Sequence, residues 1–323
     1  MTDDWKVYTG AGRPSGKTPG LPDPPPWRAY GGTVPDRDRT IKTSAEPNGA
    51  KFKARPNVIE AVNAALHLRR PLMLTGRPGS GKSMLIESVA NELSLGKVLR
   101  WHVTSSSTLK EALYRYDAVG RLQELQLTKE APEITDYLTL GPLGTALLPT
   151  RTPRALLIDE IDKADIDLPN DLLNVFERGE FEIPELARVG GAHDIREAPP
   201  GTERFAIHDG HVSCAQFPFV VLTSNGERDF PAAFLRRCIR LRMPPPDVEL
   251  LTDIVTAHLG AAVAAECEGM IRQFAADAKT TRALATDQLM NAIYMVTRDV
   301  RPNSEERGRV VELLEKRLEA DQA

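Results

Sequence analysis

The 323-residue chain has few cysteines, no long hydrophobic run and no strong excess of charge of either sign. Its three cysteines, Cys214, Cys238 and Cys267, are scattered and form no C-x-x-C pair, which excludes a disulfide framework and fits a reducing cytosol. No apolar run approaches the ~18 residues that a membrane-spanning helix needs, and the start of the chain lacks the pattern of a signal peptide. The net charge of −4 argues against binding of nucleic acid through bulk charge. We therefore expect a cytoplasmic protein whose partners are neither membranes nor nucleic acids.

Glycine and proline are slightly more frequent than usual and are unevenly placed. The chain contains 23 Gly and 25 Pro, and 15 of these 48 residues lie in the first 50 positions, where few aliphatic side chains are available for burial. Residues 1–50 are therefore predicted to form a mostly disordered arm.

The pattern from residue 51 onward is that of an α/β domain. Helices are predicted at 58–68 and 83–93 from the spacing of their apolar residues. Short apolar runs that we expect to form buried strands occur at 72–74, 98–103, 155–158, 219–223 and 239–241. Buried strands that alternate with helical segments predict a parallel sheet covered by helices on both faces.

The character of the chain changes after three consecutive prolines, Pro244 to Pro246. Asp247 is placed to cap a helix that ends at Gly260, no further strand-like run follows, and helical patterns continue at 262–277, 287–297 and 305–319. We therefore predict an α/β domain at 51–246 and a small all-helical domain at 247–323.

The segment between the first predicted strand and the next helix fits the pattern G-x-x-x-x-G-K-[ST]. Its eight residues are Gly76, Arg77, Pro78, Gly79, Ser80, Gly81, Lys82 and Ser83. Glycines let backbone N–H groups surround phosphate oxygens, and the helix N-terminus adds the positive end of its dipole. Lys82 would reach the β- and γ-phosphates and Ser83 would coordinate Mg²⁺. A similar run at 12–18 fails the pattern, because Ala11 stands where glycine is required and no strand precedes it.

Polar residues stand at the ends of two other predicted strands. Asp159 and Glu160 follow the run at 155–158, and Asn225 follows the run at 219–223. Because open α/β sheets bind ligands at the carboxyl ends of their strands, these residues should lie beside the phosphate-binding loop. Asp159 would complete the Mg²⁺ shell, Glu160 would act as a general base on water, and Asn225 would hold that water or sense the γ-phosphate. The sequence thus predicts an Mg²⁺-dependent ATPase.

Two other patterns in the sequence have simpler explanations than a GTP site or a metal site. The residues from Asp117 to Gly120 fit the D-x-x-G motif of GTPases, but no apolar strand leads into them and no N-K-x-D motif occurs, so ATP is preferred over GTP. His208, His211 and Cys214 have the spacing i, i+3, i+6 but no fourth ligand at a standard interval, so we expect no zinc site.

Four stretches together resemble the AAA+ ATPases and, within them, the MoxR-like branch. They are RPLMLTGRPGSGKS (70–83), ALYRYDAVGRL (112–122), LLIDEIDKADIDLPNDLLNVFERGEFEIPE (156–185) and FPFVVLTSNGERDFPAAFLRRC (217–238). The resemblance covers about 51–300. It implies a P-loop NTPase core with a helical lid and a β-hairpin insert at 182–217. It also implies assembly of copies of the chain into a ring, of six copies in our expectation, that remodels a protein client.

The resemblance also suggests roles for arginines. Arg236 and Arg237, at the end of a predicted short helix, occupy the place of the arginine finger, which reaches the γ-phosphate held by a neighbouring subunit; Arg237 is slightly preferred. Arg282 is the candidate sensor 2 arginine of the lid, with Arg272 and Arg298 as alternatives. Two other functions stay open: a nucleotide-gated assembly switch with slow hydrolysis, and a P-loop kinase that acts on a small molecule.

Overall fold

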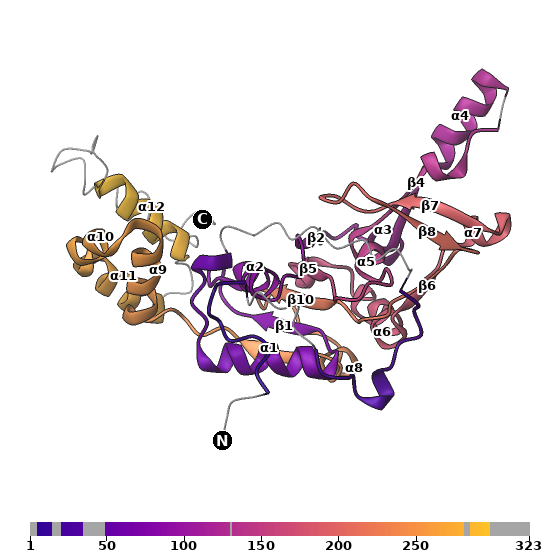
Figure 1. Ribbon diagram of the computed structural model, residues 1–323. Coiled ribbons are helices and arrows are strands. Elements are labelled where there is room, and N and C mark those ends of the chain that lie inside the picture. Colours follow the sequence, from indigo (N-terminus) through magenta and orange to yellow (C-terminus); the bar gives the residue numbers. More distant parts are fainter. Residues whose placement is uncertain (1–4, 15–20, 35–48, 130, 281–284, 298–323) are drawn as a thin grey trace.

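The computed structural model describes residues 5–14, 21–34, 49–129, 131–280 and 285–297. At its centre is a five-stranded sheet in which every neighbouring pair of strands is parallel (Figure 1). In spatial order its strands are β11 (Ile239–Arg242), β1 (Leu72–Thr75), β10 (Phe219–Ser224), β5 (Ala155–Asp159) and β2 (Leu99–His102). The carboxyl ends of all five strands meet at one edge, and the predicted α/β class is confirmed.

Side chains of the central sheet alternate between two cores, one on each face. In β1, Leu72 and Leu74 enter the core that contains α1 and α2, whereas Met73 enters the core that contains α5 and α6. Both faces are covered, which explains why the central strands are continuous apolar runs instead of alternating ones. The covering helices are α1 (Pro56–Leu68), α2 (Lys82–Glu92), α5 (Pro142–Ala146) and α6 (Leu168–Arg178).

A second, six-stranded sheet extends the molecule beside the α5 and α6 face (Figure 1). Its strands, in order, are β3 (Tyr114–Tyr116), β4 (Leu138–Leu140), β7 (Ala192–Arg196), β8 (Arg204–His208), β9 (His211–Ser213) and β6 (Glu180–Glu182). β7 and β8 form an antiparallel hairpin within the segment where an insert was expected. The remaining helices of this part of the chain are α3 (Leu109–Leu113), α4 (Ala118–Thr128), α7 (Pro184–Val189) and α8 (Ala232–Leu235).

Helix α4 stands away from the body and buries none of its side chains (Figure 1). Strand β3 leads directly into it, but only Tyr114 of its three residues is buried, so β3 is not the apolar strand whose absence was expected before Asp117. The Oδ1 atom of Asp117 accepts a hydrogen bond from the N–H of Gly120 at 2.8 Å. These two residues therefore cap a helix, which agrees with setting aside the GTPase motif.

Only helices follow β11 within the described residues. They are α9 (Val248–Leu259), α10 (Ala261–Glu266), α11 (Glu268–Thr280) and α12 (Thr286–Thr297). Asp247 caps α9 as predicted, because its Oδ1 accepts the N–H of Leu250 at 2.9 Å. The single helix predicted at 262–277 is two helices, divided at Cys267, whose backbone leaves the helical region with φ −100° and ψ 15°. The helix predicted at 305–319 lies outside the described residues.

The C-terminal helices have an apolar core of their own, separate from both cores of the central sheet. Leu251, Ile271, Phe274 and Ile293 belong to it and are almost fully buried. We therefore propose that the helices after Pro246 form a lid domain. No helix in the described part of the chain has both the length and the apolar character needed to cross a membrane.

Residues 5–14 pack against α1 and α2, which differs from the predicted disordered arm. The side chain of Tyr8 is fully buried, and its hydroxyl shares a 2.9 Å hydrogen bond with that of Ser88. The Asn63 amide accepts the N–H of Tyr8 at 3.0 Å and donates to the carbonyl of Tyr8 at 2.7 Å. Glu92 accepts hydrogen bonds from the N–H and the hydroxyl of Thr9. Composition alone missed this segment because one tyrosine and a few polar partners on distant helices hold it.

Residues 21–34 also pack on the body, with Leu21 against the core that contains α1 and α2 and Tyr30 against the other core. The buried Arg28 side chain donates to the carbonyl of Phe176 at 2.8 Å, and the ring of Tyr30 stacks on Phe217 with 5.4 Å between centroids. The Gly32 N–H donates to the carbonyl of Cys214 at 3.1 Å. The last two residues of the predicted arm belong to a 3₁₀ turn, Gly49–Lys51, and its remaining residues lie outside the described ranges.

Replacing Tyr8 with alanine is expected to lower the free energy of unfolding by about 3–5 kcal/mol, because a fully buried aromatic ring and its cavity are involved. Replacing it with phenylalanine removes only the hydrogen bond to Ser88 and should cost about 1 kcal/mol. Chemical denaturation measures both changes, with Tyr294→Ala, an exposed aromatic position, as the control. Wild-type stability of Tyr8→Ala would show that this segment does not dock in solution.

Candidate active site

The loop between β1 and α2 is shaped by glycines. Gly79 and Gly81 have φ of +69° and +82°, a left-handed conformation that other residues adopt only with strain. A Cβ atom on Gly79 would also lie 2.4 Å from the Cβ of Ala285, just before α12, so the lid and the loop touch at this point. Among the described residues no side chain caps the N-terminus of α2, so its positive end can face an anion.

Lys82 donates hydrogen bonds to three groups at this loop. Its Nζ donates to the carbonyls of Gly76 and Arg77, at 2.7 and 2.8 Å, and to Oδ1 of Asn225 at 2.8 Å. All three of its N–H donors are thus in use. Burial lowers the pKa of Lys82, and nearby carboxylates, chiefly that of Asp162, oppose this shift. The structure therefore places the predicted phosphate-binding lysine in direct contact with the predicted amide at the tip of β10.

The acid at the end of β5 faces the same loop. The hydroxyl of Ser83 lies 3.3 Å from Oδ1 of Asp159, and the hydroxyl of Thr223 also donates to that oxygen, at 2.5 Å. Thr223 in turn accepts the N–H of Glu160 at 2.9 Å. Sequence reasoning missed Thr223, although a polar residue inside the apolar run of β10 was a usable signal. The two oxygen-bearing residues predicted to bind Mg²⁺ are thus neighbours.

Glu160 leaves the end of β5 in an unusual conformation, with φ of +59°. Its Oε2 accepts a hydrogen bond from Nζ of Lys163 at 2.7 Å and lies 3.6 Å from Nε2 of His102, at the end of β2. This hydrogen bond raises the pKa of Lys163. Neither Lys163 nor His102 was predicted, because no motif marks them. A non-glycine residue at positive φ stores strain, a property that is common at functional sites.

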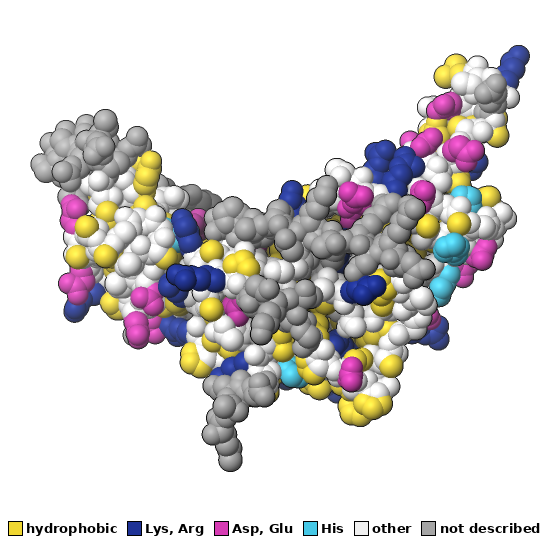
Figure 2. All heavy atoms as spheres, viewed as in Figure 1, with side chains coloured by type: hydrophobic (Ala, Val, Ile, Leu, Met, Phe, Trp, Pro, Cys, Tyr) yellow, Lys and Arg dark blue, Asp and Glu magenta, His cyan; other side chains and the backbone are white. Residues whose placement is uncertain are grey.

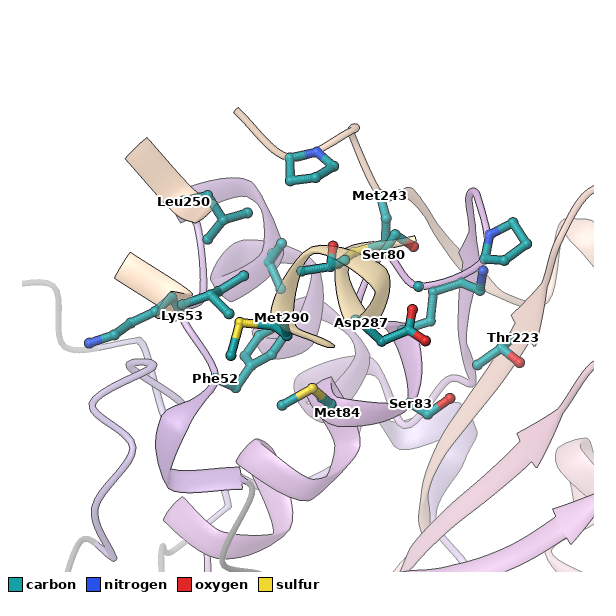
Figure 3. Close-up of a pocket in the computed structure, with 18 of the residues that line it drawn as sticks. Phe52, Lys53, Ser80, Ser83, Met84, Thr223, Met243, Leu250, Asp287 and Met290 are labelled. Carbon is teal, nitrogen blue, oxygen red and sulfur yellow. The ribbon is translucent and has the colours of Figure 1, made fainter. Parts of the chain in front are cut away.

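A cavity of about 630 Å³ opens beside the loop, and residues of both the α/β domain and the lid helices line it. Figure 3 shows Phe52, Met84 and Met290 at one end of it and Ser83 and Thr223 at the other. The cavity is therefore apolar at one end and rich in hydrogen-bonding groups at the other. Sequence reasoning missed the apolar end, whose residues come from four separate segments and form no motif. They include Phe52, Val58, Leu250, Ile254 and Met290.

The predicted arginine fingers do not line this cavity. Nε of Arg237 pairs with the carboxylate of Glu177, and its Nη1 donates to the carbonyl of Ala233 at 3.1 Å. The side chain of Arg236 is exposed and has no partner among the described residues. Arg282, the candidate sensor 2 arginine, lies outside the described residues.

Histidine side chains gather on the surface of the six-stranded sheet (Figure 2). His208 and His211 are exposed, whereas Cys214 is buried, and burial raises the pKa of its thiol to about 12. The thiol of Cys214 therefore does not lie on the exposed surface with His208 and His211. Within the described ranges no three His, Cys, Asp or Glu side chains converge on a metal-sized site.

Comparison with known proteins gives one family. The chain matches the AAA domain (dynein-related subfamily) over residues 71–238, more than half of its length. No curated protein matches it. Among solved structures it is similar to domain III of the replication initiation protein DnaA from Thermotoga maritima, with 15% sequence identity and a TM-score of 0.42, over 85% of this chain and 100% of that chain. By its match over residues 71–238, the chain belongs to the AAA domain family, in the dynein-related subfamily.

Proposed function

We propose that this chain is an Mg²⁺-dependent ATPase of the MoxR-like type that works as a ring, of six copies in our expectation, and remodels a client protein. Membership of the AAA family implies nucleotide binding and ATP hydrolysis. The observation that carries the assignment is the meeting of Lys82 with Asn225 and of Ser83 with Asp159 at the polar end of one cavity. The resemblance of the four sequence stretches supports the MoxR-like type and the remodelling role.

The two ends of the cavity suit the two ends of ATP. The phosphates would lie on the loop from Gly76 to Gly81, where the hydroxyl of Ser80 is buried and has no partner among the described residues. With ATP bound, Nζ of Lys82 would donate its hydrogen bonds to the β- and γ-phosphates instead of to the loop carbonyls. The base would lie at the apolar end, against Phe52 and Met290.

The donor set suits Mg²⁺. Ser83 and Asp159 offer oxygen ligands only, and Mg²⁺ is usually held by one or two protein groups together with waters and substrate phosphates. When bound, the ion would be held by Ser83 and Asp159 and would neutralise part of the phosphate charge. Thr223 holds Asp159 in place through its 2.5 Å hydrogen bond.

Glu160 and Asn225 suit the hydrolytic step. Glu160 lines the cavity and would accept the proton of the attacking water once its carboxylate turns from Lys163. Oδ1 of Asn225 accepts a hydrogen bond from Lys82, which leaves the Nδ2 hydrogens of Asn225 for that water or for the γ-phosphate. A complete hydrolytic set argues against a chain that binds ATP without hydrolysing it, and it is compatible with the alternative of a nucleotide-gated switch with slow hydrolysis.

AAA+ proteins commonly form rings, and the arginines of this chain fit such an arrangement. Neither Arg236 nor Arg237 lines the cavity of its own chain, so a role at the γ-phosphate requires a second copy. Because Glu177 pairs with Arg237 while Arg236 has no partner among the described residues, we assign the finger to Arg236. This assignment replaces the slight preference for Arg237 drawn from the sequence. Arg282 keeps its proposed role in the lid.

Replacing Lys82 with alanine is expected to weaken the binding of Mg²⁺-ATP by roughly 10- to 150-fold, the range for loss of a charge-assisted hydrogen bond. Titration with a fluorescent ATP analogue measures the change. Lys97→Ala, at an exposed position that does not line the cavity, is the matched control. Wild-type affinity in Lys82→Ala would show that this loop does not bind the phosphates of ATP, and it would overturn the proposed function.

A further inference from the structure

Asp162 lies three residues after Asp159, in the short 3₁₀ turn that follows β5. Its side chain is buried, with 4% of its surface exposed, and it does not line the cavity. One oxygen, Oδ2, accepts the N–H of Asn225 at 2.9 Å and the N–H of Glu227 at 3.2 Å. A single carboxylate oxygen thus holds two N–H groups of the loop that carries the candidate sensor amide.

That loop has few other supports. The ladder between β10 and β1 ends at Ser224, one residue before Asn225, and Gly226 then adopts φ of +81°. The Gly226 N–H donates to the hydroxyl of Ser224 at 3.0 Å, within the loop itself. The hydrogen bonds that Asp162 accepts tie the loop to the segment that carries Asp159 and Glu160, and Nη1 of Arg228 adds one to the carbonyl of Ala164 at 2.6 Å.

We propose that Asp162 is a positioning residue for hydrolysis, which fixes Asn225 so that its side-chain amide meets Lys82 and the attacking water. This inference rests on the proposed ATPase function. Asp162 links the end of β5, which carries the general base Glu160, to the end of β10, which carries Asn225. The relative position of these two side chains is thereby fixed.

The second oxygen of Asp162 supports a role in positioning. Oδ1 is buried and has no partner among the described residues, and a buried unpaired oxygen is disfavoured in native proteins. Among the described residues, this side chain therefore makes its hydrogen bonds through Oδ2 alone. The charge has a second effect, because it opposes the lowering of the Lys82 pKa by burial. An asparagine could keep the two hydrogen bonds without this charge, and the two contributions can thus be separated.

The test compares Asp162→Ala, Asp162→Asn and the control Asp167→Ala, which removes a nearby exposed acid. Loss of position by about 1 Å costs up to about 100-fold in rate, so Asp162→Ala should lower kcat by about 10- to 100-fold and change the KM for ATP by less than about threefold. Asp162→Asn should recover kcat to within about threefold of wild type, because one oxygen suffices. Hydrogen exchange at the N–H groups of Asn225 and Glu227 should accelerate in Asp162→Ala alone.

Each contrary result overturns the proposal. Unchanged kcat or unchanged exchange in Asp162→Ala would show that Asp162 does not fix the loop. Equal damage in Asp162→Asn and Asp162→Ala would assign the effect to charge at Lys82 instead of position. If the wild-type protein shows no turnover, the ATPase function fails, and protection of the N–H groups of Asn225 and Glu227 still decides whether Asp162 fixes the loop.

Discussion

Replacing Arg236 with alanine is expected to slow ATP turnover by about 10³- to 10⁵-fold, the range for arginine fingers in related NTPases. The Arg236 side chain is exposed and lies outside the cavity of its own chain, so in the proposed ring its charge would reach a γ-phosphate bound by the next copy. Steady-state release of phosphate at saturating Mg²⁺-ATP measures the change, at protein concentrations where the wild type is assembled.

Arg237→Ala is the matched control for this prediction. Arg237 is engaged by Glu177 within its own chain, so its loss should slow turnover by about tenfold at most. ATP affinity should stay close to wild type in both variants, because neither arginine lines the cavity. A larger loss in Arg237→Ala would assign the finger to Arg237, and wild-type turnover in both would contradict a finger supplied by a second copy.

Replacing Glu160 with glutamine is expected to lower turnover by about 10²- to 10⁴-fold, the usual contribution of a general base. Glutamine keeps the shape of the side chain and can still accept a hydrogen bond from Lys163, so ATP should bind with wild-type affinity. Phosphate release and an ATP titration on the same sample measure the two quantities. The control Glu182→Gln, in the six-stranded sheet, should turn over ATP at the wild-type rate. Substantial turnover in Glu160→Gln would show that another group acts as the base.

A mixture of the two variants tests the ring directly. A site formed by the cavity of an Arg236→Ala subunit and the finger of a Glu160→Gln subunit has every required group. Mixing should therefore restore part of the turnover that each variant lacks alone. Absence of any recovery, in samples shown to contain mixed assemblies, would contradict a site shared between copies.

The regular part of the site was predictable because periodic rules govern it. Buried strands in a parallel sheet end at one edge, so the residues that follow β1, β5 and β10 had to converge. The contacts of Lys82 with Asn225 and of Ser83 with Asp159 are the result. Local glycine patterns also located the loop, since positive φ at Gly79 and Gly81 depends on the residue type itself.

The rest depended on contacts between segments that no pattern links. The apolar end of the cavity combines Phe52, ahead of α1, with Leu250 and Met290 from two lid helices. The choice between Arg236 and Arg237 depends on Glu177, which lies 60 residues away in sequence. The predicted disorder of the arm was wrong for residues 5–14 and 21–34, because a composition rich in glycine and proline does not reveal which few side chains are buried.

The docked segment at residues 5–14 links the stability of the active site to the start of the chain. It contains no helix or strand, and side chains of α1 and α2 hold its N–H groups. Such a stretch is expected to open as a single foldon before the sheet does. Its release would leave Glu92 without its partner at the end of α2, the helix that begins at Lys82. Proteolytic trimming of this segment would therefore allow the phosphate-binding helix to fray from its far end, without any change in the catalytic residues.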